Sequence, residues 1–431
     1  MRIAVIGGGV CGLTAAIELA KEKQDVVLFE SAPVPGGRTR SFFDRKVNCW
    51  IDHGPHLMTG AYQATRQLLS EASHASSISD SALLCLQPSL DLALWDRERG
   101  LFHLKPNPSL PFGLGLLSAC ARLPGHHFNS ASGMIRLLLA SRRPIDPAQS
   151  VAKWLAKLKL PYPLENDLLT PLCLGIMNEN PSTANAKSFC RVLRQVFANH
   201  NSARLAWFRK PISQALVDPI QAYACSLGVN IQTGTRVRQL LPTDNNVRLV
   251  LNKDQEPAFD SVILALPAWA RNKLLGWKQH FSTRPISNIH LWFDDHLSLP
   301  EPLIGGLGTH GQWFFDISRL VDDEPQQRSH ICAVISADDS NMRPGDYRNR
   351  ICNEIGGILN LQRPPTPFHC RQIVERRATV LVRHQPRKPP LSDRIIDAGE
   401  EPEPGDLPAT IEAAVLRGKQ AATRLFNQKN R

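Results

Sequence analysis

The chain has 431 residues, 42% hydrophobic and 21% charged, which is the composition of a globular protein long enough for two domains. Its formal net charge is +11, but only 6% of the residues are aromatic and no nucleic-acid motif accompanies the charge, so we expect no nucleic-acid partner. The ten cysteines form no C-x-x-C pair, which argues against a metal site and a disulfide framework and predicts reduced thiols in the cytoplasm.

The first thirty residues predict a strand, a turn, a helix and a second strand. RIAVI is typical of a buried parallel strand, CGLTAAIELAKEK of a helix, and DVVLFE of the next strand. Between the first strand and the helix, Gly7 permits a tight turn, Gly9 lets the backbone approach a pyrophosphate, and Gly12 lets the helix pack closely. Glu30 follows Gly12 by 18 residues, where a carboxylate can accept a hydrogen bond from a ribose hydroxyl. This order predicts a Rossmann-like dinucleotide site.

A second glycine pair follows in the segment SAPVPGGRTRS. This segment resembles the motif of the flavin amine oxidase and phytoene desaturase superfamily. The resemblance implies that Arg38, with the neighbouring backbone at Gly37 and Thr39, approaches the pyrophosphate of FAD. We therefore expect FAD rather than NAD; the alternative is an ordinary basic loop.

Helical periodicity recurs between residues 86 and 205, for example in SLPFGLGLLSACARLP, GMIRLLLASRR and SVAKWLAKLKL. Some of these helices are apolar on more than one face and carry basic residues near their ends, such as Arg136, Arg142 and Arg143. This pattern predicts a helical lid over an apolar cavity, in contact with an anionic membrane surface; ordinary buried helices are the alternative. The sequence from Gly125 to His127 predicts a surface turn.

The nucleotide fold resumes later in the chain. GVNIQTGTRVRQLL predicts one strand, NVRLVLNK its antiparallel partner, VILALP a buried strand, and LPATIEAAVLRGKQAATRLF a last helix. In the superfamily that the chain resembles, the residue at the position of Val237 contacts adenine through its backbone. A second insertion contains the predicted strands ISNIHLWF, GQWFFDIS, HICAVISA and RATVLVRH.

These elements predict an α/β protein in which a discontinuous Rossmann-like FAD-binding domain holds an inserted α+β substrate domain with a helical lid. We assign residues 1–85, 206–278 and 391–431 to the FAD-binding domain, and residues 86–205 and 279–390 to the substrate domain.

The segment DHGPHLMTGAY resembles a motif of the hydroxysqualene dehydroxylases, also called squalene-associated FAD-dependent desaturases. It keeps Asp52 and His56 of that motif, with His53 in place of the usual Asn and Pro55 in place of the usual Gln. The stretches around PLCLGIMN and GDLPATIEAAVLRG resemble the same family, and the resemblance covers nearly the whole chain.

One loop departs from the family pattern. Where relatives have A-G-D before the last helix, this chain reads DAGEEPEPGD, so that Gly399 is followed by Glu400 and then by Glu401. The resemblance implies that the acid at position 400 hydrogen-bonds the ribityl or phosphate region of the flavin. A longer side chain among further acids predicts a weaker cofactor site as one alternative.

The resemblance implies reductive removal of the hydroxyl of hydroxysqualene, with reduced flavin as the hydride donor, and hence a long-chain isoprenoid as substrate. An acid must then assist the departing hydroxyl. His56 and His53 are our candidates for this acid because histidine titrates near neutral pH, and Asp52 is placed to orient either one. The alternative for His56 is a structural hydrogen bond to the backbone or the flavin.

Three other readings stay open. The same fold would suit a carotenoid-type desaturase or isomerase, a flavin amine oxidase-like enzyme, or a non-catalytic isoprenoid-binding relative. For the leading reading we expect peripheral contact with the inner face of the cytoplasmic membrane and association with enzymes of squalene synthesis.

Overall fold

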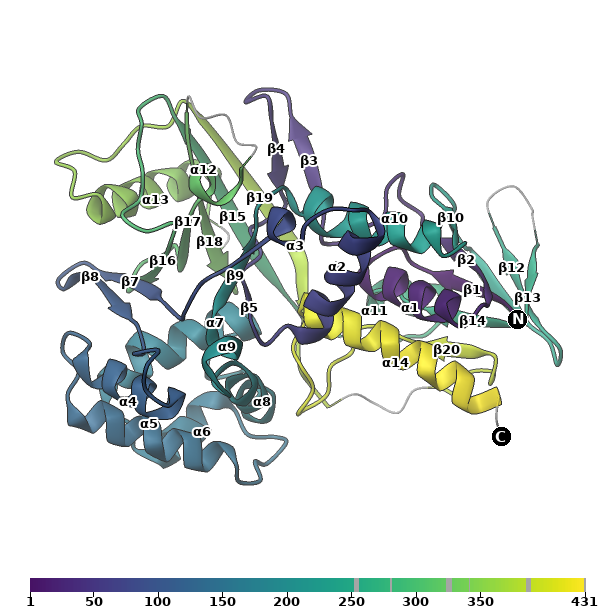
Figure 1. Cartoon of the computed structure of the whole chain (residues 1–431), viewed down its shortest axis with the longest axis horizontal. Helices are drawn as coiled ribbons and strands as arrows, with labels where there is room; N and C mark the ends of the chain where they lie inside the picture. Colours follow the sequence, from purple (N-terminus) through teal and green to yellow (C-terminus); the bar gives the residue numbers. More distant parts are fainter. Residues whose placement is uncertain (252–255, 280, 323–327, 341, 385–388, 430–431) are drawn as a thin grey trace.

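The computed structural model describes residues 1–251, 256–279, 281–322, 328–340, 342–384 and 389–429 (Figure 1). Near the two termini lies a five-stranded parallel sheet in the order β10-β2-β1-β14-β20. Its strands come from three separate parts of the chain: β1 (Arg2–Ile6), β2 (Asp25–Phe29), β10 (Asn230–Gln232), β14 (Ser261–Leu264) and β20 (Ile395–Asp397). The expected Rossmann-like order of strand, glycine turn, helix and strand is confirmed at its centre.

Each face of this sheet has its own covering layer, because alternate residues of a strand point to opposite sides. Ile3 and Val5 face a layer of helices, namely α1 (Val10–Lys21), α2 (Gln63–Ala75), α10 (Asp218–Ser226) and α14 (Ile411–Lys429). Ala4 and Ile6 face α11 (Ala268–Leu275) and a small antiparallel sheet of β11 (Gln239–Pro242), β12 (Val247–Val250) and β13 (Ala258–Phe259). The sheet is therefore buried on both faces.

The last helix completes the helical layer. Glu412, in the first turn of α14, accepts hydrogen bonds from Ala64 N (2.9 Å), Thr65 N (2.9 Å) and Thr65 Oγ1 (2.7 Å) at the start of α2. Gly418 of α14 packs against α1 so closely that an added Cβ would lie 2.5 Å from Cys11 O. The C-terminal helix therefore holds the first two long helices in place.

A seven-stranded sheet forms the second half of the molecule, in the order β19-β15-β18-β17-β16-β7-β8. Its strands are β7 (Leu92–Asp96), β8 (Gly100–Leu104), β15 (Thr283–Phe293), β16 (Leu303–Leu307), β17 (Trp313–Asp316), β18 (Ser329–Ser336) and β19 (His369–Val380). Helix α13 (Pro344–Ile358) packs on one face, and the short α12 (Ile317–Leu320) follows β17. Each of the four strands predicted in the second insertion overlaps an observed strand, but RATVLVRH is strand only as far as Val380, where β19 ends.

A helical lobe packs against the other face of this sheet and lies at the end of the molecule away from the termini (Figure 1). It contains α4 (Phe112–Arg122), α5 (Phe128–Ser141), α6 (Val151–Leu158), the π-helix η1 (Leu164–Leu169), α7 (Thr170–Met177), α8 (Ala186–Val196) and α9 (His200–Ala203). Among the described residues, no helix is both long and apolar enough to cross a membrane.

Shorter elements join the two sheets. A hairpin is formed by β3 (Ser41–Asp44) and β4 (Cys49–Asp52), and a three-stranded sheet by β5 (Met58–Thr59), β9 (Leu205–Phe208) and β6 (Leu84–Leu86). The remaining turns are α3 (Asp80–Leu83) and the π-helix η2 (Ser213–Val217). The domain boundaries assigned from the sequence stay a prediction.

One predicted strand is wrong. GVNIQTGTRVRQLL is not continuous, because the chain turns at Gly234, whose φ is +64°, and leaves the parallel sheet. Its first part is β10 beside β2, and its second part is β11 beside β12. The predicted partner NVRLVLNK forms β12 up to Val250, and its last residues lie outside the described part of the chain.

Candidate functional site

The glycine turn between β1 and α1 has the shape that its sequence predicts. Gly7 has a φ of +111°, and an added Cβ at Gly12 would lie only 1.8 Å from Gly7 O. An added Cβ at Gly9, by contrast, would meet no atom within 4 Å. Gly9 is also the N-cap of α1, whose first N–H groups no capping side chain accepts. Open space beside a helix N-terminus suits a phosphate group.

The second glycine loop lies directly on the first. Gly36 N donates to Gly8 O at 2.8 Å, and an added Cβ at Gly37 (φ +60°) would lie 3.4 Å from Gly9 Cα. The buried Thr39 closes this loop by donating from Oγ1 to Gly36 O at 2.8 Å. The structure therefore brings together the two glycine segments that the sequence singled out.

Glu30 lies at the end of β2 and organises the same turn. Its Oε2 accepts from Gly8 N at 2.7 Å, and its Oε1 accepts from Ala32 N at 2.7 Å. Thr235 N donates to Glu30 O at 2.9 Å, which places Val237 just beyond this end of the sheet. The predicted ribose contact of Glu30 and the predicted adenine contact of Val237 are thus on one side of the glycine turn.

The acidic loop before α14 meets Arg38. Glu400 pairs through Oε2 with Arg38 Nη2, while Arg38 Nη1 donates to Ala378 O at 2.7 Å. Glu401 pairs with the fully buried Arg271, which also binds Asp397 at 2.9 Å. The two glutamates are therefore compensated by arginines, and the crowding of acids expected from the sequence is relieved.

One buried oxygen of Glu400 has no hydrogen-bond donor among the described residues. Glu400 is 4% exposed, and its Oε1 accepts no hydrogen bond from any residue that the structure describes; Arg417 Nη2 lies 3.9 Å away. A buried acceptor without a donor fits a ligand that brings a hydroxyl. Together with the open helix N-terminus and the cationic Arg38, these features fit a dinucleotide that carries both phosphates and hydroxyls.

A pocket lies among the seven-stranded sheet, the β3–β4 hairpin and strand β9. Its walls are largely apolar and include Trp207, Phe315 and Leu320. Four polar residues also line it: Asp52, His56, His290 and His330. The pocket adjoins the second glycine loop, because Asp52 Oδ1 accepts from Ser41 Oγ at 2.6 Å and Ser41 follows Arg38 by three residues.

Two of the pocket histidines, His56 and His290, are electrically neutral at neutral pH. Burial lowers the pKa of His56 to about 4, and repulsion from Arg38 adds to the shift. Burial also lowers the pKa of His290 well below its ordinary value, assisted by repulsion from His330. His56 therefore does not titrate near neutral pH, contrary to the expectation from the sequence, and it is a hydrogen-bond donor or acceptor rather than a stored proton.

His290 and His330 form a pair that sequence reasoning missed. His290 Nδ1 lies 2.9 Å from His330 Nε2, both residues are 1% exposed, and the His330 ring stacks on Trp292 with centroids 4.3 Å apart. The ring of His290 also hydrogen-bonds the main chain of Asp52. If the other ring nitrogen donates to that carbonyl, Nδ1 of His290 accepts and His330 donates. Each histidine interrupts an apolar strand segment, which is the signal that could have revealed them.

Asp52 and His53 hold the pocket wall. Asp52 Oδ1 accepts from Ser41 Oγ at 2.6 Å and from Ile212 N at 2.9 Å. His53 O accepts from Asn288 Nδ2 at 2.8 Å, and an added Cβ at Gly54 would lie 2.6 Å from Asn288 Oδ1. Asp52 Oδ1 thus links strand β3 to the start of η2, which indicates that Asp52 positions the elements of the pocket wall.

The comparisons with known proteins cover almost all of this chain. A family model described as flavin containing amine oxidoreductase matches residues 10–426. Hydroxysqualene dehydroxylase from Rhodopseudomonas palustris is 28% identical over 97% of this chain and 96% of its own length, and that from Zymomonas mobilis is 24% identical over 97% of each. The solved structure of a putative protoporphyrinogen oxidase from Exiguobacterium sp. 255-15 superposes with a TM-score of 0.67 at 15% identity, covering 100% of this chain and 99% of that one.

Proposed function

Since the chain belongs to the flavin containing amine oxidoreductase family, we propose that it is an FAD-dependent oxidoreductase that removes the hydroxyl of hydroxysqualene to give squalene. The observation that carries this proposal is the largely apolar pocket beside the dinucleotide site, with the neutral His56 and His290 among its few polar groups. A C30 alcohol has the same character, since it is a long hydrocarbon with one hydroxyl.

We assign the cofactor to the two glycine loops and the acidic loop. The residues that would hold FAD are Gly7, Gly9, Gly12, Glu30, Gly37, Arg38, Thr39, Val237, Gly399 and Glu400. The pyrophosphate would lie at the N-terminus of α1, with Arg38 as a nearby cation. Oε1 of Glu400 would accept from a hydroxyl of the cofactor, since it lacks a donor among the described residues. When bound and reduced, the flavin supplies a hydride.

The reaction requires a dry pocket and a donor for the leaving oxygen. The C–O bond of the alcohol breaks, the oxygen takes one proton and leaves as water, and the carbon takes the hydride. The walls around Trp207 and Phe315 exclude water, and their π-faces stabilise positive charge that develops on the substrate carbon.

His56 and the His290–His330 pair are the groups that can meet the oxygen. An imidazole N–H in a low-dielectric pocket stabilises the negative charge that develops as the C–O bond lengthens. A neutral imidazole can also relay the proton that completes water, giving up the proton of one ring nitrogen while the other ring nitrogen takes one up. Asp52 acts on this arrangement through its main chain, which hydrogen-bonds His290. His53 lies behind the wall, with its ring edge-on to Phe42 at 5.6 Å.

Alternative functions follow from the same site. A desaturase or isomerase of a carotenoid-type substrate would use the same pocket with hydride transfer from substrate to flavin. An amine oxidase-like enzyme or a non-catalytic isoprenoid-binding protein would share the fold. Cytoplasmic location, contact with the membrane and association with squalene-pathway enzymes stay predictions.

Product analysis tests the proposal. We would record the visible spectrum of the purified protein, reduce it anaerobically by light, and add hydroxysqualene in detergent. Formation of squalene with matching reoxidation of the flavin is expected. A yellow protein that leaves hydroxysqualene unchanged would contradict the assigned substrate, and a colourless protein would contradict the cofactor.

Two variants test the assigned histidines within this assay. His56→Gln and His330→Gln should keep their flavin and form squalene at least about a hundredfold more slowly, the contribution typical of a proton-transferring group. His296→Gln, at an exposed position, is the control and should match the wild type. Full turnover by either pocket variant would refute the role given to that residue.

A further inference from the structure

The positive charge of this protein is concentrated in the helical lobe. Between Glu98 and Asp146 the sequence has six Lys or Arg residues and no Asp or Glu. Three lysines, at 153, 157 and 159, follow before the next acid, Glu165. The whole chain, by comparison, has 50 Lys and Arg against 39 Asp and Glu. Over the helices of the lobe, residues 112–203, ten Lys or Arg stand against four Asp or Glu, a net +6 of the +11 carried by the whole chain.

Helix α5 carries an exposed apolar stripe on this lobe. Phe128 is 88% exposed, Leu139 56% and Ile135 44%. These residues are seven and four positions apart, so they share one side of a helix with 3.6 residues per turn. The opposite side, with Met134 and Leu137, is buried in the core of the lobe. A helix that is already packed on one side thus presents large hydrophobic side chains on the other.

Basic residues flank the stripe on both sides. By the same helical geometry, Arg136 lies along one edge and the C-cap residue Arg142 along the other, while Arg143 follows just beyond the helix; all three are exposed. Arg136 binds the carbonyls of Leu158 (3.1 Å) and Lys159 (2.9 Å), which brings the exposed Lys159 to the same edge.

The stripe and its cations form one defined surface. We call Phe128, Ile135 and Leu139, with the flanking Arg136, Arg142, Arg143 and Lys159, the α5 face. The turn after Lys159 packs against the buried side of the same helix, because an added Cβ at Gly133 would lie 2.7 Å from Pro161 Cδ.

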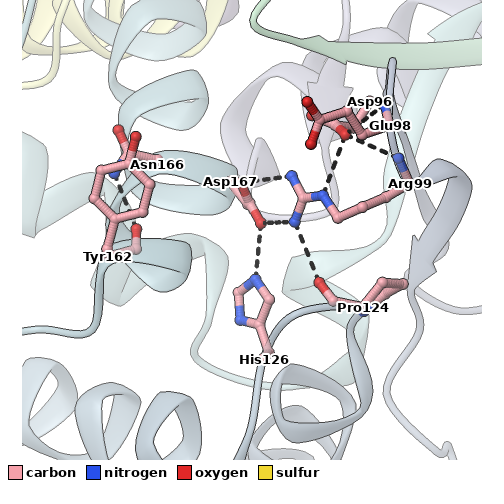
Figure 2. Close-up of polar contacts among 8 residues, drawn as sticks. All are labelled: Asp96, Glu98, Arg99, Pro124, His126, Tyr162, Asn166 and Asp167. Carbon is pink, nitrogen blue, oxygen red and sulfur yellow. Dashed lines mark hydrogen bonds and ion pairs between the residues drawn. The ribbon is translucent and has the colours of Figure 1, made fainter.

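A buried ionic cluster fixes the position of this face (Figure 2). Asp167 of η1 accepts from Arg99 at 2.5 and 3.1 Å and from His126 Nε2 at 3.0 Å, and Arg99 also donates to Pro124 O at 3.2 Å. His126 is 3% exposed, so the surface turn predicted for Gly125 to His127 is wrong at its central residue. The cluster ties the start of α5 to the β7–β8 hairpin and to η1.

From these observations we propose that the α5 face docks on the surface of an anionic lipid bilayer, with Phe128, Ile135 and Leu139 entering the interface and the flanking cations facing the lipid phosphates. An apolar stripe between rows of cations matches the layering of a bilayer surface, apolar below and anionic above. A second copy of the chain fits less well, because two such faces would bring like charges together. From residue 99 to residue 164 the sequence has a single acid, Asp146.

Docking by the α5 face would place the helical lobe on the bilayer, in which a long-chain apolar substrate dissolves. The inference itself does not rest on the proposed reaction, because the α5 face and its charge are separate from the pocket. Its failure and the failure of the dehydroxylase proposal are therefore distinguishable.

Vesicle flotation of the full-length holoprotein tests the docking face. We expect binding to phosphatidylcholine vesicles that contain about one-third phosphatidylglycerol, little binding to phosphatidylcholine alone, and weaker binding in about 0.5 M salt. The double variant Phe128→Ser with Leu139→Ser removes two side chains that we expect to enter the bilayer surface. Its binding to the vesicles should be weakened at least tenfold. Arg142→Gln with Arg143→Gln should also weaken binding by about tenfold or more.

Matched substitutions elsewhere control for general loss of surface apolarity or charge. Ile78→Ser with Leu361→Ser removes two side chains that are 40% and 41% exposed, and Arg350→Gln with Arg363→Gln removes two exposed cations. These variants should bind like the wild type, and every variant should retain its flavin. Absence of wild-type binding to anionic vesicles, or unchanged binding by the α5-face variants, would overturn the proposal. A dimer in sedimentation velocity that Phe128→Ser abolishes would overturn it in favour of self-association.

Discussion

Replacement of Asp167 by asparagine should destabilise the helical lobe strongly. Oδ2 of Asp167 accepts from both Arg99 Nη1 and His126 Nε2, and Oδ1 accepts from Arg99 Nη2. An asparagine can keep its single oxygen at the first position, but its NH2 group then faces an N–H of Arg99, donor against donor. The substitution also leaves the guanidinium without its buried counter-charge.

The expected cost follows from burial. Removing one partner of a buried ion pair typically costs about 3–5 kcal/mol, and we expect about 3 kcal/mol because Arg99 is 28% exposed and keeps Asp96. Urea unfolding followed by circular dichroism measures it. The matched control is Asp322→Asn, which breaks an exposed pair with Arg209 and should cost less than about 1 kcal/mol. A loss below about 1 kcal/mol for Asp167→Asn would refute the reasoning.

The same variant has a predicted pH signature. Burial alone would raise the pKa of Asp167, but the hydrogen bonds from His126 and Arg99 outweigh it and hold the pKa below the ordinary value. A carboxylate with a lowered folded-state pKa stabilises the fold fully above its unfolded pKa, near 4, and this stabilisation is lost as pH falls through the folded pKa. The difference between wild type and Asp167→Asn should therefore be constant near neutral pH and shrink below about pH 4.

Other substitutions separate cofactor binding from folding and test the buried histidine. Gly9→Asp should leave the melting temperature of the apoprotein nearly unchanged, because an added Cβ at Gly9 meets no atom within 4 Å. The purified variant should nevertheless lack the visible absorbance of bound flavin, and retained flavin would contradict the assigned site. Gly12→Ala should lower both stability and flavin content, because its Cβ would lie 1.8 Å from Gly7 O; calorimetry of the apoprotein measures the first effect, and an unchanged melting temperature would contradict it. Between pH 8 and acid pH, His56→Gln should lose less of its free energy of unfolding than the wild type loses. The pKa of His56 is lowered to about 4 in the folded protein, so only the unfolded chain takes up this proton between about pH 6.5 and 4. The wild type therefore loses about 1.4 kcal/mol of stability per pH unit in that range. Parallel pH curves for the two proteins would disprove this.

Local patterns predicted the parts of the site that are contiguous in sequence. The spacing from Gly7 to Glu30 specifies a strand, a turn and a helix, because each glycine answers a backbone requirement that no other residue meets. The pairing of His290 with His330 could not be predicted in this way. It depends on the register of β15 against β18, in which His290 lies opposite Cys332 and His330 opposite Trp292.

Charged groups were the hardest to place from sequence. The run from Gly125 to His127 has the composition of a turn, and only a carboxylate 41 residues further on explains why His126 is buried. The acids at 400 and 401 suggested repulsion, but Arg38 and Arg271, more than a hundred residues away, compensate them. Long-range ion pairs leave no periodic signal in a sequence, so their effects are visible only in the fold.

The strand order of the parallel sheet has a consequence for biosynthesis. Strands β1 and β2 are made first, but their neighbours β14 and β20 follow some hundreds of residues later, and the carboxylate that caps α2 belongs to α14. The glycine turn thus leaves the ribosome long before the elements that support it. Nascent chains would expose an apolar sheet edge through most of translation, which makes them clients for chaperones, and the cofactor would enter only after synthesis of the last helix.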